Sequence, residues 1–343
     1  MKYFLLLTGI SILALTSMTC HAPTEPSSNS ADTTSNSFTF KTYTFGGNAG
    51  SCLLNDVAIV SDTNIWAVGA IYVDSADGNA DLSPYNAVHW DGQAWTLLRV
   101  PYLYQGQPFY HPIQAVFALS PNDIWFGGNG MEHWDGQDFL DVEDINPVWP
   151  SSRMRSIWAS SDRNIYVVGD EGTAAHFGGS WQALNTGTTT DINDVWGAGN
   201  SPVYCAVSNS FDPNEEKRIL KITNGTKVDT VSWVGREVSS VWTPDGTHLY
   251  ACGDGVFQND GTGWKEMVTG ASIYTSCIRG NGTDDIVVVG GFGFIAHWNG
   301  AHWKIYTSAM DAIYTRVAAK GNLIVAVGNS GTSEQTVITM GRR

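Results

Sequence analysis

The sequence predicts an all-β repeat fold, and two observations support this prediction. The first is a phrase that pairs histidine and tryptophan with a turn, AVHWDGQAWT at residues 87–96, which recurs with a period of roughly 40 residues. Further copies begin at His133, His176 and His297, and a weaker copy begins at Phe257. The second is the composition, with 12% aromatic residues, 14 Trp and 37 Gly among 343 residues. Aromatic strands separated by glycine turns are typical of β-proteins with a large core.

Each copy of the phrase predicts a strand, a tight turn and a second strand. In the first copy Val88 and Trp90 alternate with His89, as in a half-buried strand. Asp91-Gly92 favours a turn, because glycine tolerates positive φ and aspartate accepts local backbone hydrogen bonds. The histidines occupy one position in different repeats and so lie far apart, which argues against a shared zinc site.

From residue 37 onward the chain divides into seven units of short strands, lettered A to D. The first two units have strands at 55–60, 64–70, 86–90 and 95–100, then at 113–119, 123–128, 131–134 and 139–142. The next two have strands at 155–159, 164–169, 174–177 and 181–185, then at 192–197, 202–208, 218–223 and 230–234. The fifth and sixth have strands at 238–243, 248–253, 255–258 and 264–268, then at 273–278, 285–290, 294–298 and 303–307. The seventh has only 313–318, 322–328 and 336–340.

The strand that the seventh unit lacks has a counterpart before the first unit. Residues 38–45, FTFKTYTF, form a spare strand, and their strict alternation slips between Phe40 and Tyr43, which allows a bulge. In a closed ring the N-terminal strand completes the last blade and removes the exposed sheet edges. We therefore predict a seven-bladed β-propeller of four-stranded antiparallel blades, closed by the N-terminal strand and spanning residues 37–343.

The repeat resembles the Asp-box-like and photosystem-assembly-factor-like propeller superfamily. The resemblance rests on IWAVG at 65–69, IYVVG at 165–169 and DGQAW at 91–95, and it covers about residues 37–343. A full Asp-box, S-x-D-x-G-x-T-W, is absent. The resemblance implies a propeller and, as one possible role, an assembly or stability factor for an envelope complex. It specifies no ligand, because one fold serves many functions.

The N-terminal residues indicate export. Lys2 precedes a mostly apolar stretch, residues 3–18, that is too short for a comfortable membrane span. The sequence SMTC resembles the end of a bacterial lipoprotein signal, in which Cys20 would carry the lipid; an ordinary signal peptide is the alternative. We assign residues 1–20 to this signal and the polar residues 21–36 to a disordered linker. The predicted location is the bacterial cell envelope, either lipid-anchored or periplasmic or extracellular.

Charge and cysteine content restrict the partners. A formal net charge of −15 disfavours nucleic acid and anionic membrane surfaces, because phosphate binding needs a basic patch. Beside Cys20 the chain has Cys52, Cys205, Cys252 and Cys277, for which export permits three disulfide connectivities. The last three lie in apolar strand patterns, so we favour buried free thiols. We expect a monomer without a cofactor.

Loop lengths indicate which face binds. In four-stranded blades the B–C and D–A connections lie on one face, and the long connections 71–85, 101–112, 143–154 and 209–217 are all of these two kinds. Long loops on a rigid scaffold are where binding sites usually lie. Aromatic side chains in two of them are the predicted ligand-binding residues, with capping of the blade ends as the alternative: Tyr102, Tyr104, Phe109, Tyr110, His111 and Trp149.

The first long loop also offers oxygen ligands for calcium. Asp74, Asp77 and Asp81 could bind Ca²⁺, but their spacing does not match the Asp-x-Asp-x-Asp-Gly loop. A solvated acidic loop is therefore favoured.

An enzymatic alternative rests on arginines near the axis. Sialidases share the Asp-box propeller and need three converging arginines, for which Arg155, Arg236 and Arg316 are candidates together with Tyr314. Such a glycoside hydrolase or lyase would use the axial pocket. Glutamate is sparse nearby, whereas glycosidic cleavage usually needs two placed carboxylates. We therefore favour a non-catalytic binding or scaffold module for an envelope protein or a glycan.

Overall fold

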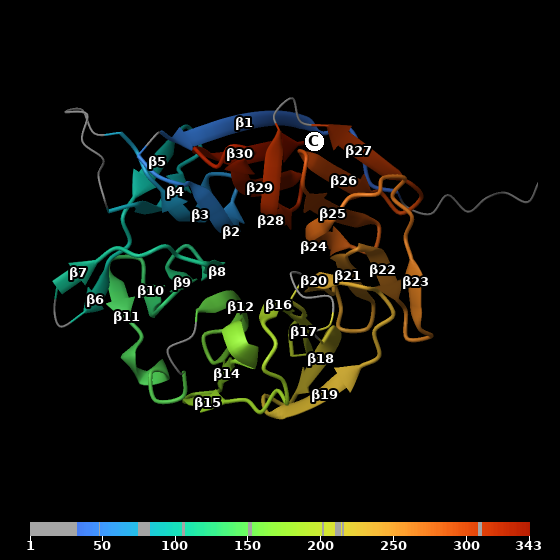
Figure 1. Ribbon diagram of the computed structural model, residues 1–343, viewed down its shortest axis with the longest axis horizontal. Coiled ribbons are helices and arrows are strands. Elements are labelled where there is room, and N and C mark those ends of the chain that lie inside the picture. The colour runs from blue at the N-terminus through green and yellow to red at the C-terminus, as the bar shows by residue number, and fades with distance from the viewer. Residues whose placement is uncertain are drawn as a thin grey trace, which may run out of the picture. The chain divides into compact units, whose positions relative to one another are not determined.

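The computed structural model describes residues 33–47, 49–74, 83–104, 107–149, 153–200, 202–209, 214, 216–307 and 311–343. These residues form seven four-stranded sheets and one two-stranded sheet. The seven sheets surround a central axis as blades, and the A strand of each lies nearest to that axis (Figure 1). The predicted seven-bladed propeller is therefore confirmed.

In blades one to six the four strands follow chain order from the axis outward. Blades one and two consist of β2 (Leu53–Ser61), β3 (Asn64–Ile71), β4 (Tyr85–Trp90) and β5 (Trp95–Leu98), and of β8 (Ala115–Ser120), β9 (Asp123–Gly127), β10 (Met131–Trp134) and β11 (Phe139–Asp141). Blades three and four consist of β12 (Met154–Ser161), β13 (Asn164–Gly169), β14 (Ala174–Phe177) and β15 (Trp181–Ala183), and of β16 (Ile192–Trp196), β17 (Val203–Val207), β18 (Arg218–Thr223) and β19 (Lys227–Val231).

The remaining three blades complete the ring. Blades five and six consist of β20 (Val238–Trp242), β21 (Leu249–Gly253), β22 (Gly255–Asn259) and β23 (Trp264–Glu266), and of β24 (Thr275–Gly282), β25 (Asp285–Gly290), β26 (Phe294–Trp298) and β27 (Trp303–Thr307). Blade seven consists of β28 (Ala312–Lys320), β29 (Leu323–Ser330), β30 (Gln335–Arg342) and, outermost, the N-terminal β1 (Thr39–Gly46).

The pairing of β1 with β30 closes the ring, as predicted (Figure 1). Their register is uninterrupted over the whole of β1. The bulge that the sequence allowed between Phe40 and Tyr43 does not occur, because Thr42 stays opposite Thr339 and their hydroxyls hydrogen-bond at 2.9 Å. One continuous ladder therefore joins the two ends of the propeller.

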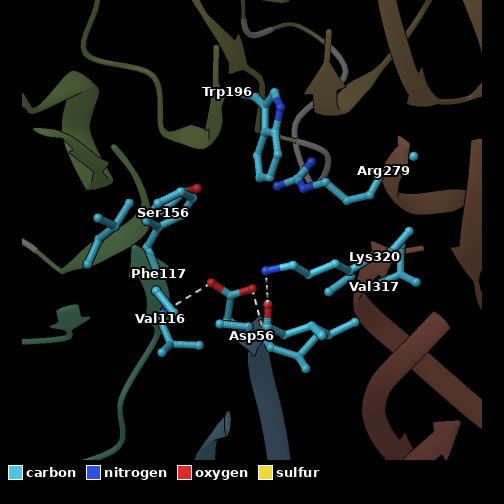
Figure 2. Close-up of a pocket in the computed structure, with 16 residues that line it drawn as sticks. Asp56, Val116, Phe117, Ser156, Trp196, Arg279, Val317 and Lys320 are labelled. Atoms are coloured by element: carbon cyan, nitrogen blue, oxygen red, sulfur yellow. Dashed lines mark hydrogen bonds between the residues drawn. The ribbon is translucent and has the colours of Figure 1, made fainter. Parts of the chain in front are cut away.

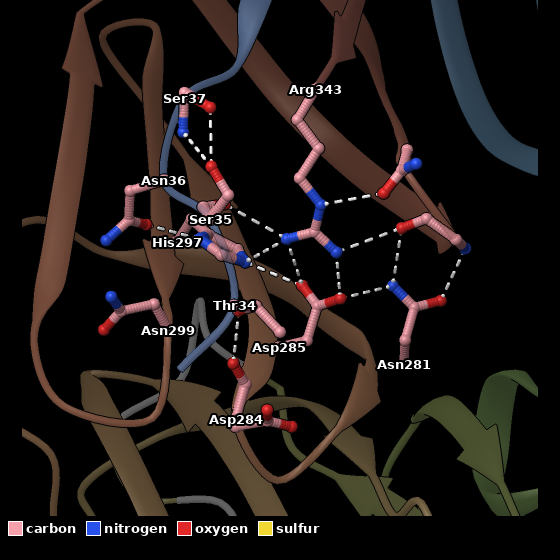
Figure 3. Close-up of polar contacts among 12 residues, drawn as sticks. Thr34, Ser35, Asn36, Ser37, Asn281, Asp284, Asp285, His297, Asn299 and Arg343 are labelled. Carbon is pink, nitrogen blue, oxygen red and sulfur yellow. Dashed lines mark hydrogen bonds and ion pairs between the residues drawn. The ribbon is translucent and has the colours of Figure 1, made fainter. Parts of the chain in front are cut away.

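A polar cluster fastens one end of this ladder, where β1 begins and β30 ends, to blade six (Figure 3). Arg343 forms an ion pair with Asp285 and donates to the backbone carbonyl of Ser35. His297 lies between Asp285 Oδ1, 2.7 Å from its Nε2, and Asn36 Oδ1, 2.5 Å from its Nδ1. Ser35 and Asn36, which the sequence analysis assigned to a disordered linker, are thus hydrogen-bonded to the propeller.

The repeated histidine joins the C strand of a blade to the start of its B strand. In blade one His89 Nε2 lies 3.0 Å from Asn64 Oδ1, and the two ring centroids of His89 and Trp66 are 4.5 Å apart. The same polar contact joins His133 to Asp123, His176 to Asn164 and His297 to Asp285. The described part of the chain contains no group of three potential metal-ligating side chains.

The turn that follows this histidine is fixed by an aspartate. Asp91 Oδ1 accepts backbone N–H bonds from Gln93 and Ala94, both at 2.8 Å, and Gly92 adopts φ 98°. These N–H donors hold the pKa of Asp91 below its usual range. The repeated phrase is therefore a structural corner, as the sequence predicted.

The cysteines lie within the blades. Cys52, Cys205, Cys252 and Cys277 are buried and free, and burial raises the thiol pKa values of Cys205 and Cys252. The interpretation of these side chains as small apolar groups is confirmed. Among the described residues no helix is long and apolar enough to cross a membrane.

Candidate functional site

Two of the long connections have a secondary structure of their own. We call the face that carries the B–C and D–A connections the long-loop face and the opposite face the short-loop face. Between blades one and two, β6 (Tyr102–Tyr104) and β7 (Gln107–Phe109) form a hairpin (Figure 1). The 3-10 turns η1 (Glu143–Ile145) and η2 (Asp170–Gly172) lie on the same face.

Some of the predicted ligand-binding aromatics lie at the surface of this hairpin. Phe109 is 59% exposed. Tyr102 is half-buried against Gly130, where an added Cβ would lie only 2.2 Å from the Tyr102 ring. Tyr110 is half-buried and the Arg99 guanidinium lies 6.0 Å from its ring centroid. Tyr104 lies in β6, but its side chain is outside the described part.

The other two predicted aromatics, Trp149 and His111, are buried. Trp149 packs with Ile145 in the core between blades two and three. His111 is 5% exposed, and burial lowers its pKa. Both side chains fit the alternative, in which the aromatic residues of the long loops cap the ends of the blades.

Blade two contains a buried carboxyl group, Glu132, that was not among the predicted site residues. Glu132 on β10 is 1% exposed, lies opposite Asp141 on β11, and neither of its carboxylate oxygens has a hydrogen-bond partner. Burial, with a smaller contribution from Asp141, raises the pKa of Glu132 to about 8. The sequence gives little indication of this group, since Glu132 lies beside His133 in a short strand flanked by Met131 and Trp134.

Replacement of Glu132 by glutamine is expected to stabilise the protein at alkaline pH. The folded state holds a proton on Glu132 up to about pH 8, whereas the unfolded chain releases it near the ordinary value of 4.5, so stability falls as pH rises between them. Ionisation of Glu132 in the folded state therefore costs on the order of 5 kcal/mol relative to the unfolded chain. Urea unfolding at about pH 6.5 and about pH 8.5 should show this fall for the wild type and for the control E143Q, whose glutamate is exposed, but not for E132Q. A parallel fall in E132Q would contradict this assignment.

Large apolar side chains that remain exposed gather on the long-loop face. Phe292, 79% exposed, lies on the B–C turn of blade six, next to the start of β28 where Gly293 donates to the carbonyl of Ala312. Of the exposed large hydrophobic residues in the described part, only Leu140 and Ile305 lie elsewhere, on outer strands. The others are Leu103, Phe109, Val234, Val268, Tyr274, Phe292 and Ile313.

A repeated bulge builds the axial opening on this face. Every A strand except that of blade two has a register shift near its start, and a bulge turns a side chain out of the regular alternation. The extra residues line one cavity of about 250 Å³, which we call the axial mouth. They are Asn55, Arg155, Asn193, Ser239, Ser276 and Thr315, and Gln114 takes the same place in blade two.

The arginines of the enzymatic alternative are only partly brought together. Arg155 and Arg316 both line the axial mouth, whereas Arg236 lines a different cavity and pairs with Asp254. Tyr314 also borders the mouth, but it is fully buried, with its hydroxyl 2.7 Å from Thr339 Oγ1 inside blade seven. No carboxylate is among the described residues that line the mouth, so the three-arginine site and its acids are not assembled there.

The two arginines of the mouth differ in their partners. Arg155 forms ion pairs with Asp170 and Asp191. Arg316 is half-buried, and its Nη2 donates to the backbone carbonyl of Asn193 at 2.6 Å. Within the described part no carboxylate lies within ion-pair distance of Arg316. The mouth therefore holds a guanidinium whose remaining N–H groups can bind an anionic group.

A buried ion pair crosses the axis below the mouth. Arg279 of blade six donates to both carboxylate oxygens of Asp194 of blade four, at 2.8 and 2.9 Å. Ser156 and Ser240, from blades three and five, also donate to Asp194. Burial alone would raise the pKa of Asp194, but Arg279 and Ser240 hold it below its usual range. This cluster connects four blades.

The remaining predicted sites lie at the margin of the described part. Asp74 lies beside Gly47, and an added Cβ there would meet its carboxylate. Asp77, Asp81 and the lipidation residue Cys20 are outside the described residues. The calcium site and the lipid anchor therefore stay predictions.

The fold and the axial mouth define the class of protein: a seven-bladed propeller with a polar axial opening and an apolar rim.

No protein-family model and no curated protein matches the chain. Among solved structures, YCF48 bound to a D1 peptide matches with a TM-score of 0.65 at 13% identity, over 89% of this chain and 95% of that one. YCF48 from Cyanidioschyzon merolae matches with 0.62 at 13%, over 88% and 98%. The WD40 propeller of Doa1 matches with 0.57 at 18%, over 87% and 97%. These likenesses establish the fold alone.

Proposed function

We propose that the protein is a non-catalytic module that binds an extended segment of another protein over the axial mouth. One observation carries this proposal: the exposed apolar side chains of Tyr274 and Ile313 line the axial mouth together with Arg316, a guanidinium without a carboxylate partner among the described residues. Exposed apolar side chains with a polar surround are typical of protein-binding surfaces.

The chemistry of this surface defines the segment. Tyr274 and Ile313 line the mouth beside Arg316, and Phe292 stands at the same corner between blades six and seven. A segment that carries a carboxylate next to apolar residues would place the acid on Arg316 and the apolar groups on this rim. The YCF48 propeller bound to a D1 peptide supports a peptide ligand by analogy of fold.

We expect substitutions at the rim of the axial mouth to weaken peptide binding. A random peptide library is selected on the full chain, and the affinity of the enriched peptides is measured by fluorescence anisotropy. I313D, F292D and R316M should each weaken binding by about tenfold or more. The matched controls I305D and L140D change equally apolar, exposed residues on outer strands and should stay within about twofold.

Three outcomes would contradict the proposal. The controls could weaken binding as much as the rim variants, the library could enrich no peptide, or a glycan array could show rim-dependent binding where peptides show none.

We also propose that the protein acts outside the cytoplasm of a bacterium, anchored by a lipid on Cys20. The N-terminal sequence supports this: a short positive region, an apolar stretch and SMTC. Lipidation would hold the propeller at a membrane, with residues 21–33 as a tether. Cell fractionation tests the anchor, since C20S should leave the membrane fraction; equal amounts of C20S and wild type in that fraction would refute it.

A further inference from the structure

A second cavity lies between the A strands, toward the short-loop face. Figure 2 shows the side chains that line it. It has a volume of about 200 Å³ and is built from the C-terminal halves of the A strands. Its walls are mostly apolar, with Val57, Ile59, Val116, Phe117, Ile157 and Val317 among them. We call it the short-loop pocket. Ligand pockets typically combine apolar walls with a few placed polar groups.

The polar group at the centre of these walls is Asp56. Its Oδ1 accepts the backbone N–H of Val57 at 2.9 Å, and its Oδ2 accepts that of Val116 at 3.0 Å. Burial raises the pKa of Asp56 to about 6, although Arg316 on the neighbouring blade opposes this, so the group is a carboxylate at neutral pH. Each carboxylate oxygen can accept a further hydrogen bond.

Two cations, Arg279 and Lys320, line the pocket together with Asp56, but neither forms an ion pair with it among the described residues. Arg279 is held by both oxygens of Asp194, with its guanidinium 4.2 Å from the Trp196 ring centroid. Lys320 also lines the pocket, and its Nζ donates to the backbone carbonyls of Val60 at 2.9 Å and Ile59 at 3.5 Å. Within the described part, Asp56 has no ion pair. The pocket therefore presents a partly desolvated carboxylate with no fixed counter-ion.

We propose that the short-loop pocket binds a small organic amine whose apolar body is about the size of one aromatic ring. The ammonium group donates to the free lone pairs of Asp56, and the ring packs against Phe117 and Trp196. The size follows from the volume, since a dry apolar cavity of about 150 Å³ holds a benzene molecule in another protein. The pocket opens at the other end of the axis from the proposed peptide site, although Asp56 and Arg316 interact electrostatically.

Benzylamine and benzyl alcohol test this proposal, because they share a ring and differ in charge. Titrations at pH values well above the pKa of Asp56, followed by NMR shifts of the tryptophan indole signals, should show benzylamine binding about tenfold more tightly than benzyl alcohol. D56N should remove this difference. A118L, which adds methyl groups to the pocket wall, should block both ligands.

Thermal melting first establishes that each variant folds. If D56N does not fold, the loss of benzylamine binding in A118L tests the proposal. I313D is the matched control, since it should leave benzylamine binding unchanged, and selected peptides should bind A118L, which changes no charge, as they bind the wild type. Equal affinities for benzylamine and benzyl alcohol, no binding at millimolar concentrations, or unaltered benzylamine binding by A118L would each overturn the proposal. None of these results bears on the peptide site.

Discussion

Removal of residues 1–46 is expected to abolish cooperative unfolding of the propeller. The deletion takes away β1, whose eight residues pair with β30. It also takes away Phe38 and Phe40 from the core between blades six and seven, and Tyr43 and Phe45 from the core between blades seven and one. Loss of one buried aromatic side chain costs about 3–5 kcal/mol, against a total stability of about 5–15 kcal/mol.

Circular dichroism during heating and size-exclusion chromatography measure the result. The shortened chain should aggregate, because β30 then presents an unpaired edge. Removal of residues 1–32 is the control and should leave the melting temperature unchanged, since β1 and the cluster around Arg343 stay intact. A soluble, cooperatively melting protein without β1 would show that closure by this strand is not what holds the ring.

The second large effect is expected from Arg279→Met. This variant leaves the Asp194 carboxylate buried without its cation, and removal of one partner of a buried ion pair typically costs about 3–5 kcal/mol. The double variant with Asp194→Leu should regain much of this loss, because it removes the unpaired charge as well. Urea unfolding of the two single variants and the double variant gives the coupling energy.

Arg236→Met provides the matched control for this cycle. Arg236 is paired with Asp254 but its side chain is 87% exposed, and exposed pairs contribute little. Its removal should not change stability measurably. If Arg279→Met proved as harmless as Arg236→Met, the cluster would not connect the blades as its hydrogen bonds suggest.

The sequence predicted the fold because the fold repeats. The same pattern of strands and corners occurs seven times, so an ambiguous strand in one copy can be assigned from the others. The spare strand at residues 38–45 could pair only with the seventh unit, which lacks its fourth strand. The histidine corner was also interpretable, since Asp91-Gly92 specifies its own turn. Periodicity and turn chemistry are local properties of the sequence, and they were sufficient to predict the fold and its corners.

The site was less predictable, because it depends on contacts between distant residues. The exposure of Trp149 was misjudged, since its burial comes from packing across blades that no local pattern encodes. The axial mouth depends on bulges, which shift the register by one residue and turn Asn55 and Asn193 toward the axis. A signal was present in the polar pair that opens most A strands, such as Asn55-Asp56 and Asn193-Asp194. Which side chain of each pair faces the axial mouth depends on the strand register, which the sequence does not show.

Hydrogen–deuterium exchange of the complex with a selected peptide tests the central claim most directly. A peptide bound over the axial mouth should slow exchange in the segments 272–276, 290–294 and 311–316, which surround Tyr274, Phe292 and Arg316. The corners of the short-loop face, such as 89–95, should exchange as in the free protein. Protection of those corners, with no change around the mouth, would contradict the assignment of binding to the long-loop face.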